Sequence, residues 1–98
     1  MQFKRALQLK PKSVEARANL AVVYLMAGKL DQSEAEVHRA MQVSQANAHL
    51  HYLLGRIYQQ RGMNEKAVRE LKTALQLDRN LKEAERLLNK ITRGEAKG

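Results

Sequence analysis

LAVVYLMAG at residues 20–28 is the stretch that decides the fold, because it returns 34 residues later as LGRIYQQRG at residues 54–62. Leu, Tyr and Gly stand at the same offsets in both copies. A second stretch, RALQL at residues 5–9, returns at the same spacing as RAMQV at 39–43 and TALQL at 73–77. A fixed period of this size is typical of repeat proteins, in which each unit buries its apolar face only by stacking on the next.

The apolar and small residues within each copy follow the 3.6-residue period of a helix, and no segment shows the alternation of a strand. Ser13 and Asn47 can cap helices, and Gly28 and Gly62 can end them, because glycine tolerates the left-handed conformation. The segments Asp-Gln-Ser-Glu at 31–34 and Asn-Leu-Lys-Glu at 80–83 have the pattern of capping boxes that would begin further helices. Short connections between these helices predict antiparallel neighbours.

The composition excludes several classes of protein. There is no cysteine, hence no disulfide or thiol chemistry, which is compatible with a reducing compartment. No apolar run approaches the roughly 18–20 residues that span a bilayer, and the N-terminus lacks the apolar core of a signal peptide. We therefore expect no membrane insertion by this segment and favour a cytoplasmic location.

The net charge is +8, from 18 Lys and Arg against 10 Asp and Glu. Such a balance would suit acidic partners or polyanions. The basic residues are dispersed among glutamates rather than gathered in one block, however. This pattern favours a solvated helical surface over a nucleic-acid patch.

The two copies resemble the tetratricopeptide repeat family, whose unit is a 34-residue helix–turn–helix. Counted from Val14 and Ala48, the positions typical of the family are occupied in both copies: Leu20 and Leu54, Ala21 and Gly55, Tyr24 and Tyr58, Gly28 and Gly62, Ser33 and Ala67, Ala40 and Ala74. The frequent tryptophan near the start of the first helix is replaced by Arg17 and His51. The resemblance covers nearly the whole chain.

The resemblance implies an all-α fold, a right-handed superhelical stack of antiparallel helix pairs (an α-solenoid), in one domain over residues 1–98. Residues 1–10 would be the second helix of an incomplete repeat, 14–47 and 48–81 two complete repeats, 82–93 a terminal helix, and 94–98 a frayed tail. The terminal helix carries polar residues among its apolar positions. It would cover the end of the stack, as terminal units must for solubility.

In this family the first helices of the repeats line a concave groove that takes an extended peptide or a partner helix. The resemblance implies that the groove is lined by Val22, Leu25, Met26, His49, Tyr52, Arg56, Gln59, Arg86 and Lys90. One end of this set is apolar and the other is basic, so a peptide with apolar anchors followed by acidic residues would fit. The alternative is that Leu25 and Met26 are packing residues and that the arginines only solubilise the surface.

Catalytic and metal-binding patterns are absent from the sequence. His49 and His51 point to different faces of a helix and His38 belongs to another helix, so we expect no metal site and no cofactor. No serine has a His–carboxylate pair at a suggestive spacing, and there is no glycine-rich phosphate loop. The carboxylate pairs Glu34/Glu36 and Glu83/Glu85 diverge on a helix and are interpreted as solvated. We therefore expect no enzyme.

The leading hypothesis is a non-catalytic protein–protein interaction scaffold that forms part of a larger assembly. The alternative is self-association, as a dimer or swapped dimer, through the half-repeat at 1–10, where Phe3, Ala6 and Leu7 lack a partner. Binding of RNA through the basic surface is disfavoured, because only Tyr52 is placed to stack on a base.

Overall fold

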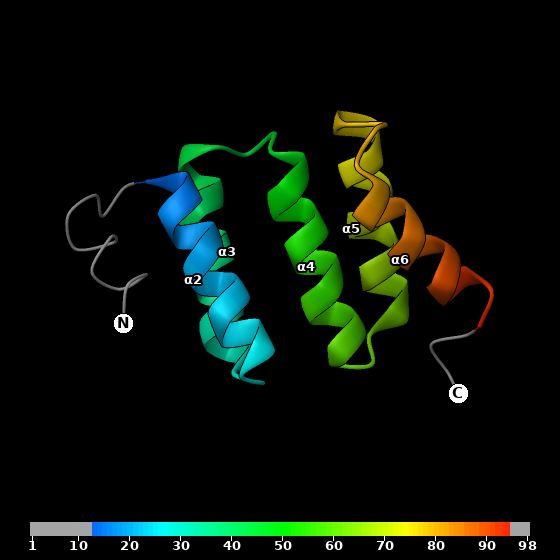
Figure 1. Cartoon of the computed structure of the whole chain (residues 1–98), viewed down its shortest axis with the longest axis horizontal. Coiled ribbons are helices and arrows are strands. Elements are labelled where there is room, and N and C mark those ends of the chain that lie inside the picture. The colour runs from blue at the N-terminus through cyan, green and yellow to red at the C-terminus, as the bar shows by residue number, and fades with distance from the viewer. Residues whose placement is uncertain (1–12, 95–98) are drawn as a thin grey trace. The chain divides into compact units, whose positions relative to one another are not determined.

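A computed structural model of the chain describes residues 13–94. These residues form helices α2 (Val14–Met26), α3 (Leu30–Val43), α4 (Ala48–Gln60), α5 (Asn64–Leu77) and α6 (Lys82–Thr92) (Figure 1). They contain no strand, and the expected all-α class is confirmed. The expected self-association residues Phe3, Ala6 and Leu7 lie outside the described residues.

The chain divides into two units between Ala46 and Asn47, and the helices within each unit pack in sequential order. In the first unit α2 packs against α3, and in the second α4 packs against α5 and α5 against α6. Within each unit the connections are three to four residues long, and each helix turns back along its neighbour (Figure 1). This is the sequential helix pairing of the predicted α-solenoid.

Two of the predicted helix caps are confirmed in atomic detail. The side-chain oxygen of Ser13 accepts a hydrogen bond from the backbone N–H of Ala16 at 3.1 Å. The side-chain oxygen of Asn47 accepts one from the N–H of Leu50, also at 3.1 Å. Each bond satisfies an N–H group that has no partner inside the helix.

Gly28 and Gly62 end the first helix of each repeat with φ of 77° and 78°. In both turns the next residue donates its N–H back to the carbonyl of the repeat tyrosine: Lys29 to Tyr24 at 2.8 Å, and Met63 to Tyr58 at 2.9 Å. The left-handed glycine makes this closure possible, because a Cβ would strain the backbone there.

The two predicted capping boxes are wrong. Helix α3 begins at Leu30 and α6 at Lys82, and neither has a side-chain cap. The glycine turn at Gly28 leads the chain directly into α3, so that the helix has already begun at residues 31–34. Before α6, the Asp78 carboxylate instead accepts the N–H of Asn80 at 3.0 Å, which forms a turn ahead of the helix.

Small residues allow the helices within a unit to approach closely. Ser33 is 1% exposed, and its hydroxyl donates to the carbonyl of Ala21 across the α2–α3 contact at 2.7 Å. One core cluster of the second unit likewise contains three buried alanines with two larger residues; its members are Ala67, Leu71, Ala74, Ala84 and Ile91. Aromatic and leucine side chains, including Tyr52, pack around this cluster.

Gly55 is required for a different reason from the turn glycines. A Cβ at this position would lie 2.7 Å from Cδ2 of Leu71. In the first repeat the equivalent residues are Ala21 and Val37, both fully buried. Ala21 is larger than Gly55, and Val37 is smaller than Leu71. The two repeats therefore fill the space between their helices with different pairs of residues.

We predict that Gly55→Ala destabilises the wild-type protein but stabilises the Leu71→Val variant. With Leu71 present, overpacking costs about 1–3 kcal/mol, which exceeds the gain in helix propensity. With Leu71→Val the clash is relieved, and the gain of about 1 kcal/mol from replacing a helical glycine remains. Urea unfolding of the four proteins of this cycle gives the coupling energy. The same effect of Gly55→Ala in both backgrounds would contradict the size argument.

Candidate interaction site

Three side chains of α4 form a row along one face of the helix. His49, Tyr52 and Arg56 are spaced by three and four residues, the spacing at which helical side chains meet. The rings of His49 and Tyr52 have centroids 5.9 Å apart, and the guanidinium carbon of Arg56 lies 5.8 Å from the centroid of Tyr52. Tyr52 itself is half-buried against the core of the second unit. The core therefore holds the ring on which Arg56 stacks.

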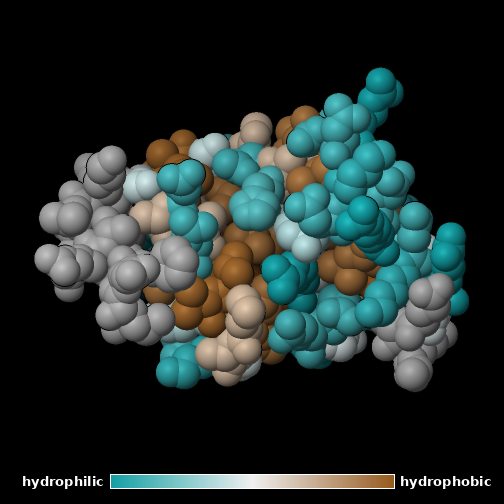
Figure 2. Space-filling view, viewed as in Figure 1, coloured by the Kyte–Doolittle hydropathy of each residue, from teal (hydrophilic) through white to brown (hydrophobic). Residues whose placement is uncertain are grey.

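A second row, on α6, consists of Glu83, Arg86 and Lys90, all exposed and again spaced by three and four residues. Helix α6 contacts α4, and Glu83 lies close enough to His49 for its negative charge to favour the protonated imidazole. Hydrophilic residues gather over α6 in the space-filling view (Figure 2). We call the combined surface the α4–α6 face; it consists of His49, Tyr52, Arg56, Gln59, Glu83, Arg86 and Lys90.

The permanent charges of the α4–α6 face are mainly positive. Arg56, Arg86 and Lys90 stand against the single carboxylate of Glu83. Arg56 is half-buried, whereas the other two cations are exposed. A guanidinium stacked on a ring keeps its N–H edge directed outward, where it can donate two hydrogen bonds to one carboxylate. The face is therefore chemically suited to an acidic ligand.

The pKa of His49 is lowered from its ordinary value of 6.5. Although the side chain is exposed, desolvation by neighbouring groups is the largest cause, since it disfavours the charged imidazolium. The positive charge of Arg56 lowers the pKa further, and the negative charge of Glu83 opposes the shift. In the free protein at neutral pH, His49 is consequently uncharged.

The predicted groove residues of the first unit have different environments. Leu25 is 1% exposed and belongs to the core, so it offers no surface to a peptide. Val22 is half-buried, and Met26 is 77% exposed. Of the residues predicted for the apolar end, Met26 is thus the most accessible.

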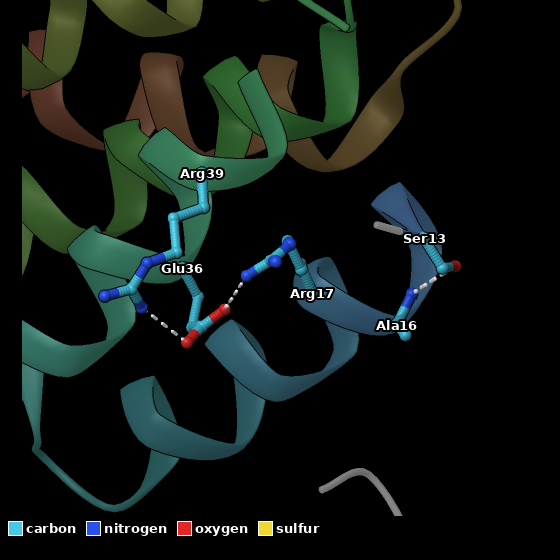
Figure 3. A network of polar contacts seen from close by, with 5 residues as sticks. All are labelled: Ser13, Ala16, Arg17, Glu36 and Arg39. Carbon is cyan, nitrogen blue, oxygen red and sulfur yellow. Dashed lines mark hydrogen bonds and ion pairs between the residues drawn. The ribbon is translucent and has the colours of Figure 1, made fainter. Parts of the chain in front are cut away.

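A polar contact between the two helices recurs in both repeats and was not predicted from the sequence. In the first, Arg17 of α2 donates to Glu36 of α3 at 3.2 Å, and Arg39 donates to the other carboxylate oxygen at 2.9 Å (Figure 3). In the second, Nδ1 of His51 lies 2.7 Å from Oε1 of Glu70. Both pairs join the two helices of one repeat. Their 34-residue offset, visible in the sequence, was the signal that could have revealed them.

The interpretation of Glu36 as a solvated carboxylate is wrong. Glu36 is 7% exposed, whereas the carboxylate of Glu34 is partly exposed and lies 3.3 Å from His38 on the same helix. Because Glu36 faces α2, Arg17 can reach it from the position where the family often has tryptophan. The contact between α2 and α3 therefore includes a largely buried ion pair, in which the opposite charges lie within hydrogen-bond distance of each other.

A hollow on the first unit has little binding capacity. It is lined by Tyr24, Asp31, Gln32, Ala35, Glu36 and Arg39. The carboxylate of Glu36 is already bound to two arginines. The α4–α6 face is the better candidate, because Arg56 stacks there on a ring that the core holds in place.

Among residues 13–94, no three His, Asp, Glu or Cys side chains lie close enough to hold a metal ion. His49 and His51 have different neighbours, as expected from their spacing: Tyr52 for the former and Glu70 for the latter. Within the same range, the helices are too short and too polar to cross a bilayer.

Comparison with protein-family models gives two matches, both described as tetratricopeptide repeat. One covers residues 2–42 and the other residues 48–81. The resemblance inferred from the sequence is confirmed over these two segments. No curated protein matches the chain.

We predict that Glu36→Gln lowers the free energy of unfolding by about 1–3 kcal/mol, because it leaves the largely buried Arg17 without its counter-charge. Glu34→Gln is the matched control two residues away, and we expect it to change the stability by less than about 0.5 kcal/mol. Chemical denaturation measures both. Equal effects of the two substitutions would mean that burial does not distinguish these carboxylates.

We predict that an NMR titration finds the pKa of His49 below 6.5, that Arg56→Gln raises it, and that Glu83→Gln lowers it further. Lys72→Gln on α5 is the control and should leave it unchanged. Because the folded-state pKa is depressed, the unfolded chain binds more protons than the folded one just below pH 6.5. The contribution of neutral His49 to stability is therefore full above pH 6.5 and declines as the pH falls toward the folded-state pKa.

Proposed function

The chain belongs to the tetratricopeptide repeat family, and we propose that it is an interaction module whose α4–α6 face binds an acidic segment of a partner protein. Tetratricopeptide repeats are protein–protein interaction modules and are typically non-catalytic. The proposal extends this general role to one surface and to one class of ligand. It includes no catalytic step and no cofactor.

The observation that carries the proposal is the stack of Arg56 on Tyr52. The ring is half-buried against the core, so that the guanidinium has a fixed support and loses less freedom when a ligand binds. Arginine and tyrosine are also the residue types that most often dominate binding energy at interfaces. The pair therefore supplies a carboxylate contact and an adjacent apolar surface.

The charges around the stack favour the same ligand. Arg86 and Lys90 on α6 add exposed positive charge, which attracts an acidic chain at long range and raises its association rate. Glu83 stands near His49 at the start of the two helices. An acidic segment is expected to direct its carboxylates to Arg56, Arg86 and Lys90 rather than to Glu83.

An apolar contact is available separately on the first unit. Met26 is 77% exposed, and a flexible thioether side chain adapts to different apolar partners. Met26→Ser therefore tests whether this side chain binds an apolar residue of a peptide. A loss of affinity for a leucine-containing peptide, with no loss for its alanine counterpart, would assign an apolar anchor to Met26.

The test of the proposal is calorimetric titration with a short peptide that alternates leucine and glutamate. The same peptide with glutamine in place of glutamate is the matched probe. We expect the acidic peptide to bind, and Arg56→Glu to weaken it by about tenfold or more, since reversing this charge costs more than 1.4 kcal/mol. Lys72→Glu makes the same charge change on an exposed position of α5 and should have a much smaller effect.

Two results would overturn the proposal. One is equal binding of the glutamate and glutamine peptides. The other is an equal loss of affinity in Arg56→Glu and Lys72→Glu, which would indicate a general charge effect rather than a site. Circular dichroism of each variant confirms that the helices remain folded.

A further inference from the structure

We infer that the α4–α6 face takes up a proton at His49 when a carboxylate binds to Arg56, so that acidic segments bind more tightly as the pH falls from about 8 toward 6. This inference rests on the proposed function, since it concerns the ligand of the same face. It adds a property that neither the family nor the charge pattern implies, namely that binding is graded by pH.

The geometry places an ionisable imidazole beside the proposed carboxylate contact. His49 and Arg56 lie on either side of Tyr52 along α4. The ring centroids of His49 and Tyr52 are 5.9 Å apart, and the guanidinium carbon of Arg56 lies 5.8 Å from the centroid of Tyr52. A carboxylate that binds to Arg56 over this ring is therefore separated from the imidazole by no more than the Tyr52 ring. Because His49 is exposed, the attraction between a bound carboxylate and the imidazolium is moderate and is weakened by salt.

The charged groups that act on His49 come from two helices. On α4 the group is Arg56, with the ionisable phenol of Tyr52 between them, and on α6 it is Glu83. Helix α5 also packs against α4, but its Glu70 is bound to His51, on a different face of α4. Glu83 therefore favours the protonated imidazole, while Arg56 opposes it.

Binding changes this balance in one direction. In the free protein, desolvation by neighbouring groups and the charge of Arg56 hold the pKa of His49 below 6.5. A bound carboxylate offsets the charge of Arg56 and adds a negative charge of its own, and both effects raise the pKa. The bound form then carries more protons than the free form within the pH range between the two pKa values.

Linkage fixes the sign of the effect on affinity. When the bound-state pKa is higher than the free-state pKa, affinity is constant above the higher value and increases as the pH falls below it. Each unit of rise in the pKa corresponds to about a tenfold gain in affinity at the low-pH limit. The glutamates of the peptide remain ionised over this range, because their ordinary pKa is about 4.3.

The other described histidines provide the comparison. His38 lies on α3 of the first unit, where it is exposed and paired with Glu34 four residues earlier. His51 is bound to Glu70 at 2.7 Å, between the helices of the second repeat. Neither lies in the row with Tyr52 and Arg56, so neither is expected to respond to a carboxylate at that row.

The experiment is calorimetric titration of the protein with the leucine–glutamate peptide at about pH 8 and pH 6, in buffers of different ionisation enthalpy. The dependence of the observed heat on the buffer gives the number of protons taken up. We expect uptake of a fraction of a proton in the intermediate range, and several-fold tighter binding at the lower pH. In His49→Gln the difference between the two pH values should disappear, whereas His38→Gln should retain it.

A second measurement does not depend on a variant. NMR titration of the wild-type imidazole signals, free and saturated with the peptide, reports the pKa of His49 directly. We expect the value to rise on binding.

The outcomes separate the two proposals. Binding that is independent of pH, without proton uptake and without a change in the pKa of His49, overturns this inference and leaves the proposed function intact. Proton uptake that persists in His49→Gln overturns the assignment to this residue. Absence of binding at every pH overturns both.

Discussion

The close approach of the two helices within each repeat is the constraint on which the rest of the structure depends. Small residues on one of the two helices make it possible. In the first repeat the hydroxyl of Ser33 on α3 bonds to the carbonyl of Ala21 on α2. In the second repeat Leu71 on α5 approaches Gly55 on α4 too closely to allow a Cβ there. Van der Waals contacts across such surfaces are individually weak, and they accumulate only when the helices touch along their length. The glycine turns then reverse the chain, so that the second helix runs at the short distance from the first that these residues permit.

The same contact contains a polar pair in each repeat, at positions where the family often has an aromatic residue. Arg17 bonds to Glu36 and His51 to Glu70, each from the first helix to the second. The Arg17–Glu36 ion pair adds little net stability compared with apolar residues of similar size, because both groups lose hydration. It does require a specific partner, however. The pair therefore favours one alignment of the two helices over others that would leave a charge buried alone.

The α4–α6 face is a consequence of this arrangement. Tyr52 presents one side of its ring to the core of the second unit, and the row on α4 is built on it. Arg56 stacks on a ring that is already held in place, and the exposed His49 lies beside the same ring. Core contacts therefore position the charges of the surface. Binding chemistry and stability are linked at this residue, because a substitution of Tyr52 would change both.

The sequence by itself determined the helical class, the 34-residue repeat, the helix ends at Gly28 and Gly62, and the caps at Ser13 and Asn47, since these depend on local backbone preferences and on periodicity. It also indicated which residues of α4 share a face. Only the tertiary structure decided that Leu25 is buried, that Glu36 pairs with Arg17, that the segments at 31–34 and 80–83 do not cap helices, and that Glu83 acts on His49. Each of these depends on the neighbouring helix, and the distance between side chains on different helices is fixed by how closely the backbones pack.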